Sequence, residues 1–384
     1  MVAGRVQRRE HFWDSVRAFL MLLGIPYHVA LSYRAGKGWI VNSGEGIEAF
    51  SYVAQIIHLF RMPAFFLIAG YFAALLLAKR EPETWLNSRI TRLGVPLIVS
   101  LVTLVPIMNL FAELSNFALP EALASWGRNS ASSGGYWVRH LWFIIVLLYC
   151  SAAVAALARW RPSLRRAVIA PRIDHWVARH FTRSLLACAV AMGLWQAVAV
   201  ELFYIGGLAT NIPQQILRLD ELIMFAPWFA LGCVVARSPR TLERMTRLSP
   251  DIAMIALNAM LVSMLFMDEM WAPVGRFVST IAAVTLTQTV IAAARRFLDR
   301  PIPMVQRLVP ASFVIYLFHM PILVALIWAG KSLGMPVTLK ALSVMLLTLV
   351  LSYGAWAVIA RSPLLSFLFN GEPIRSPQLR QQLA

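Results

Sequence analysis

Residues 12–33 read FWDSVRAFLMLLGIPYHVALSY, an apolar run interrupted by Asp14, Arg17 and His28. A helix needs roughly 20 predominantly apolar residues to cross the hydrocarbon core of a bilayer, and this run is long enough. The apolar segment of a cleavable signal peptide is shorter. The stretch therefore predicts a retained membrane-spanning helix that carries polar groups.

The rest of the chain continues this pattern. Of its 384 residues, 59% are hydrophobic and 14% charged, and the mean hydropathy is +0.67, which excludes a soluble globular enzyme. Apolar windows of spanning length occur at 12–33, 48–78, 93–115, 139–158, 181–203, 219–236, 250–270, 274–294, 308–330 and 337–360. We therefore expect an all-α polytopic membrane protein of about ten transmembrane helices. It forms a single domain over residues 1–384, with tails at 1–11 and 361–384.

The basic residues indicate how these helices are oriented. The chain has 35 Lys and Arg against 18 Asp and Glu, a net charge of +17. With helices that alternate across the membrane, 25 basic residues fall on the side of the two termini and 8 on the other, while Arg17 and Arg61 lie within helices. Cytoplasmic loops carry the excess of Lys and Arg. Both termini are therefore predicted to be cytoplasmic, and the charge does not indicate a nucleic-acid partner.

The sequence lacks the motifs that are typical of several kinds of catalytic and metal site. Cys150, Cys188 and Cys233 all lie in apolar stretches, where buried free cysteine is common. No Cys and His residues have metal-ligand spacing, and neither a G-x-S-x-G motif nor a Walker loop is present. We expect no metal and no tightly bound cofactor.

Ionisable residues inside a membrane are candidates for function because they are costly to place there. Asp14, Arg17, Gly24 and His28 recur on one face of the first helix. Arg17 and His28 would lie about 16 Å apart along a straight helix. A neutralising pair of Asp14 with Arg17 near the interface is an equally good interpretation of those two residues.

Polar side chains in three other windows have similar spacings. These residues are His58 and Arg61, then His140 and Trp142, then Ser312, Tyr316 and His319. We expect them to share one cavity with His28. His58 and His140 also suit an interfacial position, and His319 also suits a hydrogen bond between helices. Histidine can remove a proton from a hydroxyl, and arginine can bind phosphate or stabilise an oxyanion.

Two connections are long enough to bear on function. Residues 116–138 contain the Ser- and Gly-rich run 129–135, which predicts a flexible loop that serves either as a lid or as plain surface. Residues 159–183 carry seven arginines. These arginines are expected to contact anionic headgroups of membrane lipids or a polyanionic donor.

Taken in order, four motifs resemble the signature segments of the membrane acyltransferase-3 family. They are Arg17-x(10)-His28, the run RMPAFFLIAG at 61–70, HLWF at 140–143, and Ser312-x(3)-Tyr316-x(2)-His319. Residues 9–28, Trp39-x(2)-Asn42-Ser43 and the ending PLLSFLF at 363–369 resemble the members of that family that succinylate osmoregulated periplasmic glucans.

The resemblance implies an enzyme of the bacterial inner membrane that takes a succinyl group from cytoplasmic succinyl-CoA to hydroxyls of a periplasmic glucan. His28 would be the general base, although a transient acyl-histidine stays open. Arg61 would contact donor phosphate or the oxyanion, and Asp14 would orient Arg17 at the donor. Proteins of glucan synthesis or export are possible partners. An O-acetyltransferase of another envelope glycan and a proton-coupled glycan transporter are the alternatives.

Overall fold

The computed structural model describes residues 10–36, 39–41, 43–206, 211–266 and 269–373. Within these ranges the regular structure is helical, without a β-strand. Eight helices there are long and apolar enough to cross a membrane, or nine if the bent pair Ile212–Val235 and Pro239–Met245 is counted as one span. The prediction of an all-α polytopic membrane protein is confirmed.

The helices fall into two groups, those that form the eight spans and the remaining ones. The spans are α1 with α2 (His11–Leu22, Gly24–Tyr33), α3 (Glu48–Leu77), α4 with α5 (Pro82–Val102, Leu104–Leu114), α7 with η1 and α8 (Gly134–Val138, Arg139–Leu141, Trp142–Trp160), α10 (Phe181–Ile205), α15 (Ala272–Leu298), α16 (Pro303–Gly330) and α17 (Val337–Ile359). The other helices are α6 (Leu119–Ser132), η2 (Pro162–Arg165), α9 (Pro171–Arg179), α11 (Ile212–Leu217), α12 (Leu219–Val235), α13 (Pro239–Met245), α14 (Pro250–Phe266) and α18 (Pro363–Asn370).

The ten apolar windows all fall on helices, but the described residues hold eight or nine spans and three windows differ from the expectation. The window 219–236 lies on α12, which counts as a span only as part of the bent pair. The window 250–270 contains only the 17-residue α14. The window 93–115 belongs to a span that begins earlier, at Pro82. Parts of the predicted tails, residues 1–9 and 374–384, lie outside the described residues, as do Lys37 and Asn42.

The prediction of a flexible loop at 116–138 is wrong. Most of this segment is helical, as α6 and α7. The carboxylate of Glu113 on α5 explains why, since it accepts hydrogen bonds from Ser125 Oγ at 2.7 Å and from Asn129 Nδ2 at 2.8 Å. Tyr136 Oη of α7 donates to the same carboxylate at 2.7 Å. Serine and asparagine, which suggested a loop, instead hydrogen-bond α6 to α5.

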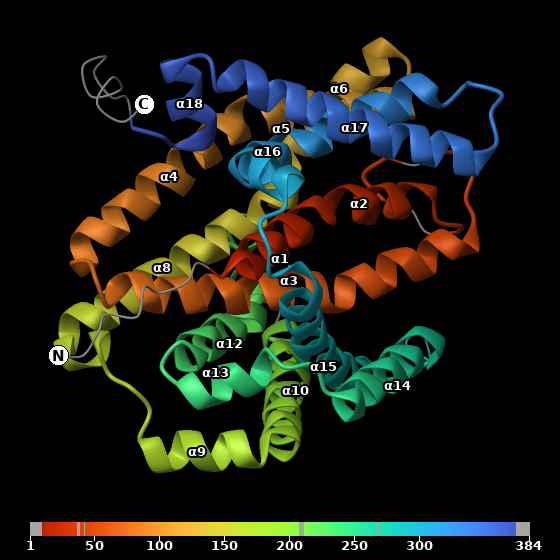
Figure 1. Ribbon diagram of the computed structural model, residues 1–384. Helices are drawn as coiled ribbons and strands as arrows, with labels where there is room; N and C mark the ends of the chain where they lie inside the picture. Colours follow the sequence, from red (N-terminus) through yellow and green to blue (C-terminus); the bar gives the residue numbers. More distant parts are fainter. Residues whose placement is uncertain (1–9, 37–38, 42, 207–210, 267–268, 374–384) are drawn as a thin grey trace.

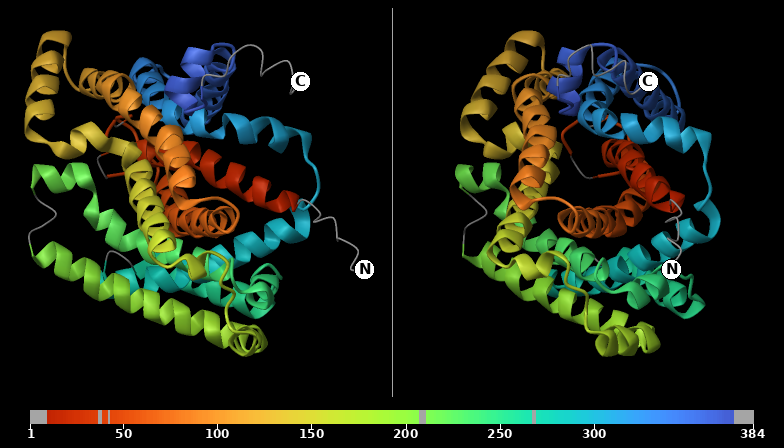
Figure 2. Two further views of the ribbon diagram at one scale, coloured as in Figure 1. Left: turned by 90° about the vertical axis from the view of Figure 1, so that its left-hand side faces the viewer. Right: turned by 60° about the vertical axis from the view of Figure 1, so that its left-hand side comes forward.

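The first three helices occupy the centre of the molecule. In Figure 1, α1, α2 and α3 lie between α16, α17 and α18 on one side and α10 and α12–α15 on the other. Both views in Figure 2 show the same order, with the red N-terminal helices enclosed by blue and green ones. The N-terminal segment is therefore positioned to form a site with helices from the whole chain.

The outer helices present apolar side chains to their surroundings. Along α17, Leu342, Leu346 and Val350 follow one another on the same face and are 55%, 62% and 56% exposed. On α10, Leu202 is 64% exposed. Such continuous apolar surface is expected where a helix faces lipid.

Helices α3 and α12 cross in close contact through two glycines. A Cβ atom at Gly70 would lie 1.9 Å from the carbonyl oxygen of Phe229, and one at Gly232 would lie 1.9 Å from that of Leu67. Small residues allow such close approach between membrane helices. The contact fixes α12 against α3, the helix that carries Arg61.

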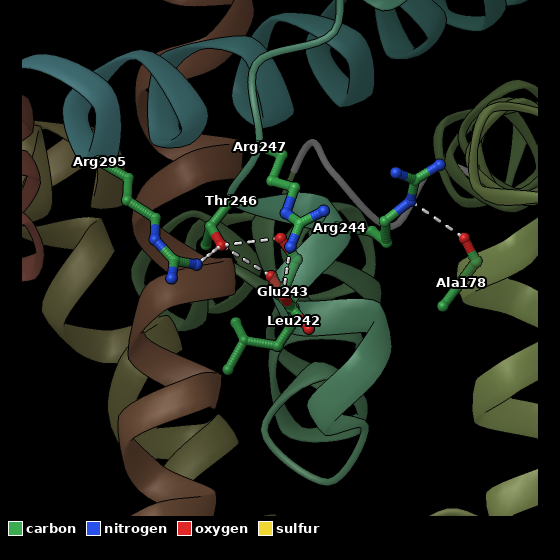
Figure 3. Close-up of polar contacts among 7 residues, drawn as sticks. All are labelled: Ala178, Leu242, Glu243, Arg244, Thr246, Arg247 and Arg295. Carbon is green, nitrogen blue, oxygen red and sulfur yellow. Dashed lines mark hydrogen bonds and ion pairs between the residues drawn. The ribbon is translucent and has the colours of Figure 1, made fainter.

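Hydrogen bonds of a carboxylate and an arginine join the short helices α9 and α13, and a second arginine binds α13 to α15. Asp174 Oδ1 accepts hydrogen bonds from the Thr241 amide at 2.9 Å and the Thr241 hydroxyl at 2.7 Å. Figure 3 shows Arg244 Nε donating to the Ala178 carbonyl at 3.2 Å and Arg295 donating to the Thr246 hydroxyl. Arg244 of α13 and Arg295 of α15 therefore bind other parts of the protein.

Candidate active site

The site begins at a break in the first span. Helix α1 ends at Leu22 and α2 begins at Gly24. Pro26 accounts for the break, because proline has no N–H for the carbonyl four residues earlier and its ring crowds that carbonyl. The two helices together still form one span, from His11 to Tyr33.

The break brings Arg61 of α3 against α1. Arg61 is 7% exposed, and its Nε donates a hydrogen bond of 3.1 Å to the Leu20 carbonyl in the last turn of α1. Gly24 makes room for the guanidinium, since a Cβ there would lie 2.8 Å from Arg61 Nη2 and 3.4 Å from His319 Nε2. A buried guanidinium and an imidazole therefore meet at one glycine.

Beside this contact lies a cavity of about 330 Å³. Side chains from the first span, α3, α8, α12 and α16 line it together with residues 39–40. The lining residues are Met21, Tyr27, His28, Leu31, Trp39, Ile40, His58, Arg61, Met62, Phe65, Arg139, His140, Trp142, Phe143, Glu221, Met224, Phe225, Tyr316 and Met320. The cavity holds groups of both charge types within a mostly apolar wall, as ligand sites commonly do.

Three imidazole rings form a continuous cluster at this cavity. The ring centroid of His319 lies 5.3 Å from that of His28 and 5.5 Å from that of His140. Trp39 stacks on His28 with centroids 5.1 Å apart. His28 thus faces the cavity, between an indole and a second imidazole.

The hydrogen bonds of His319 fix its protonation pattern. Its Nδ1 lies 2.6 Å from the Tyr316 carbonyl oxygen, and a carbonyl only accepts, so Nδ1 carries the hydrogen. In the neutral ring, Nε2 is then the basic nitrogen. Within the described residues, neither this Nε2 nor His28 Nδ1 has a hydrogen-bond partner, although both are buried. Buried nitrogen atoms in this state are typical of a site that receives a ligand or water.

Tyr27, whose ring centroid lies 4.8 Å from that of His28, belongs to a second polar group. Tyr27 Oη lies 3.2 Å from His58 Nδ1, and the guanidinium carbon of Arg61 lies 5.8 Å from the Tyr27 ring centroid. His58 itself is exposed. Tyr27 therefore connects the deep Arg61 to the exposed His58.

Tyr316 and Trp142 complete the predicted set within the cavity. Tyr316 Oη donates to the backbone carbonyl of His140 at 2.6 Å, which holds α16 to the start of α8. Trp142 stacks on Phe225 of α12 with centroids 5.4 Å apart. Of the predicted site residues, His28, His58, Arg61, His140, Trp142 and Tyr316 line the cavity.

The structure does not bring Ser312, His319, Asp14 and Arg17 to the cavity wall. The ring of His319 contacts His28 and His140, which do line it. Ser312 Oγ donates to the Val309 carbonyl of its own helix at 2.8 Å. Arg17 and Asp14 form an ion pair of 3.9 Å, and the Arg17 side chain is 49% exposed. The wall reaches Met21, which is one helical turn beyond Arg17.

Sequence reasoning did not assign Tyr27, Trp39, Arg139 and Glu221 to the cavity. Arg139 and Glu221 lie near the ends of predicted helices, where charged residues are ordinary. Glu221 belongs to α12 and accepts a hydrogen bond of 2.7 Å from Arg218. Only the packing of α12 against α3 places this carboxylate at the cavity.

The wall limits the chemistry that is available. Among the described residues that line it, none is a serine, threonine, cysteine or lysine, so histidine, tyrosine and Glu221 are the side chains left that could form a covalent intermediate. What it offers is imidazole for proton transfer and guanidinium for an anion. No group of three His, Cys, Asp or Glu among the described residues has the geometry of a metal site.

Comparison with known proteins extends this description. The sequence pattern of the acyltransferase-3 family, described as "Acyltransferase domain", matches residues 10–357. The chain is 27% identical over 379 residues to the Glucans biosynthesis protein C of Salmonella gallinarum, with 95% of each chain covered. It is 26% identical over 388 residues to the protein of that name from Escherichia coli O6:K15:H31, with 96% of each covered. No solved structure matches.

Proposed function

This chain belongs to the acyltransferase-3 family, and from that premise we propose that it transfers a succinyl group from succinyl-CoA to hydroxyls of a periplasmic glucan. The relatives named Glucans biosynthesis protein C support a glucan as acceptor. The single observation that carries the proposal is that His28 and Arg61 line one cavity within the span region, while His319 contacts the His28 ring and lies near Gly24, as Arg61 does.

In the proposed reaction His28 acts as general base. It takes the proton of a glucan hydroxyl while the hydroxyl oxygen attacks the thioester carbonyl carbon of the donor. The new C–O bond forms, the C–S bond breaks, and the proton passes from His28 to the departing sulfur. The products are a succinyl ester and the free thiol of CoA.

Arg61 supplies the positive charge that this step needs. Negative charge develops on the carbonyl oxygen in the transition state, and a fixed donor in a water-poor site stabilises it most effectively. Arg61 is suited to this role because its Nε is already bound to the Leu20 carbonyl, which holds the guanidinium in place. Arg17, one turn beyond the cavity wall, would bind the phosphates of the donor on the cytoplasmic side.

The proposal places both termini in the cytoplasm and the enzyme in the inner membrane. The distribution of Lys and Arg supports this orientation. A fluorescent reporter that folds only in the cytoplasm, fused to the C-terminus, is expected to be active. A periplasmic reporter at the same position is expected to be inactive.

Mass spectrometry of periplasmic glucans tests the proposed function. Glucans from cells that contain the chain are expected to carry succinyl groups that are missing from glucans of cells without it. Acetyl groups in their place would establish the alternative acyl specificity. Glucans of unchanged mass but changed amount in the periplasm would favour a transporter and would contradict the proposed function.

A further inference from the structure

Arg139 provides a charge in the cavity that the transfer step does not use. We propose that its guanidinium binds the free carboxylate of the succinyl donor and so selects a dicarboxylic acyl group. This inference rests on the proposed function, because it concerns the donor that the same cavity receives. It assigns Arg139 a role in specificity and none in proton transfer.

The backbone at Arg139 has a strained conformation. Its φ is +47°, in the left-handed region that residues other than glycine seldom adopt. It lies where α7 ends and η1 begins. Conformations of this kind persist where the surrounding structure holds them, and they concentrate at functional sites.

The side chain is held by a clamp from two other elements. Arg139 Nε donates to Asn109 Oδ1 at 2.7 Å, and Asn109 Nδ2 donates to the Tyr136 carbonyl at 2.7 Å. The guanidinium carbon lies 4.4 Å from the centroid of the Tyr136 ring. The Nε bond and the ring contact fix the plane of the guanidinium, which carries four further N–H donors on Nη1 and Nη2.

The nearby carboxylate of Glu113 does not neutralise Arg139 by direct contact. Glu113 accepts hydrogen bonds from the neutral donors Ser125, Asn129 and Tyr136. The two charged side chains form no ion pair in the part of the chain that the structure describes, where both of them lie. Arg139 therefore keeps a positive charge at the cavity wall.

The charges of the whole wall favour an anionic acyl group. Two guanidinium groups, of Arg61 and Arg139, line the cavity, and the carboxylate that lines it, Glu221, is bound by Arg218. One guanidinium is enough for the oxyanion of any thioester. The second suits a group that carries its own carboxylate, which arginine binds in a bidentate manner.

Arg139 shares the cavity with the residues of the proposed transfer step. His28, Arg61 and Arg139 all line the same space of about 330 Å³. A donor whose thioester carbonyl is held at His28 can therefore present its free carboxylate to Arg139 within this one cavity.

The test compares two donors of equal length on purified protein in lipid vesicles. Succinyl-CoA ends in a carboxylate, whereas butyryl-CoA ends in a methyl group. Neutral glucan from cells that lack the chain serves as acceptor. Arg139→Gln is expected to lower the ratio of kcat/KM for succinyl-CoA to that for butyryl-CoA about 100-fold, because an unpaired carboxylate in the cavity is rejected. Arg139→Lys keeps the positive charge but loses the two parallel N–H donors of the guanidinium. Its ratio of kcat/KM values should lie between those of Arg139→Gln and the unchanged protein.

Arg128→Gln is the matched control, since Arg128 is an exposed arginine of α6 outside the cavity, and its ratio should equal that of the unchanged protein. An unchanged ratio in both Arg139 variants, with succinyl transfer intact in the unchanged protein, would overturn this inference alone. Failure of the unchanged protein to use either donor would overturn the proposed function, and the inference with it.

Discussion

The imidazole rings of His28 and His319 lie with their centroids 5.3 Å apart, although they come from the first and the last quarter of the chain. His28 and Gly24 both belong to α2, and His319 belongs to α16. The side chains of His319 and of Arg61 on α3 both lie close to Gly24. The site is therefore formed by long-range packing. Its precise geometry depends on contacts that lie outside the cavity as well as within it.

Gly24→Ala should reduce acyl transfer while leaving the protein folded. The new Cβ would lie 2.8 Å from Arg61 Nη2, at the mobile end of a side chain, so the guanidinium can shift. A displacement of about 1 Å in a catalytic site can cost on the order of 100-fold in rate, and we expect a fall in kcat of about 10- to 100-fold. Transfer rates measure the fall in kcat, and the abundance of the variant in the membrane shows whether it is folded. Gly127→Ala, with open space around the glycine, is the control, and equal rates in the two variants would refute the role of Gly24.

Gly232→Ala should destabilise the bundle itself. The added Cβ would meet the Leu67 carbonyl oxygen at 1.9 Å and the Tyr71 amide nitrogen at 2.8 Å, and backbone atoms cannot turn aside. Overpacking of this kind costs about 1–3 kcal/mol, which a lower unfolding temperature in detergent would report. Gly354→Ala on α17 has nothing within 4 Å and should be neutral or slightly stabilising. A Gly232 variant as stable as the Gly354 variant would contradict the close crossing of α3 and α12.

Asp174→Asn should loosen α9 from α13 in a manner that depends on pH. Burial alone acts to raise the pKa of Asp174, but hydrogen bonds from Thr241 and from the backbone of Arg240 and Thr241 lower it below the ordinary 3.8. The ionised carboxylate therefore adds stability that is complete above pH 3.8 and is lost as the pH falls through the lowered pKa. Hydrogen bonds to a charged group contribute about 1.5–3 kcal/mol.

Protease cleavage near α9 measures this effect at several values of pH. The Asn variant should be cleaved faster than the unchanged protein at pH 7 and at pH 5. The difference should shrink below pH 3.8. If the difference in cleavage rate grew towards low pH, the ionised Asp174 carboxylate would not be the stabilising form, which would contradict the prediction.

Much of the site could be predicted because polar residues are rare in membrane helices. His28 and Arg61 stand out in apolar runs, and the spacing of Tyr316 and His319 places them on adjacent turns of one helix. In a soluble protein the same spacings would carry little information. The high cost of polar groups in lipid is what makes the pattern informative.

Other parts depend on tertiary contacts that leave no periodic signal. The position of Glu221 at the cavity follows from how α12 packs against α3. The positive φ of Arg139 falls where α7 ends and η1 begins. The helix α6 replaced an expected loop because Glu113, on the preceding helix α5, binds its Ser125 and Asn129. Only the break at Leu23 had a local cause that could have been recognised, namely Pro26.

Transfer of labelled succinyl groups from succinyl-CoA to neutral glucan, with purified protein in lipid vesicles, tests the central claim most directly. His28→Ala is expected to reduce the rate by about 100- to 10,000-fold, the usual contribution of a general base. His175→Ala, which changes an exposed histidine of α9, is expected to retain full activity. Succinyl transfer by the His28 variant at the rate of the unchanged protein would contradict the account.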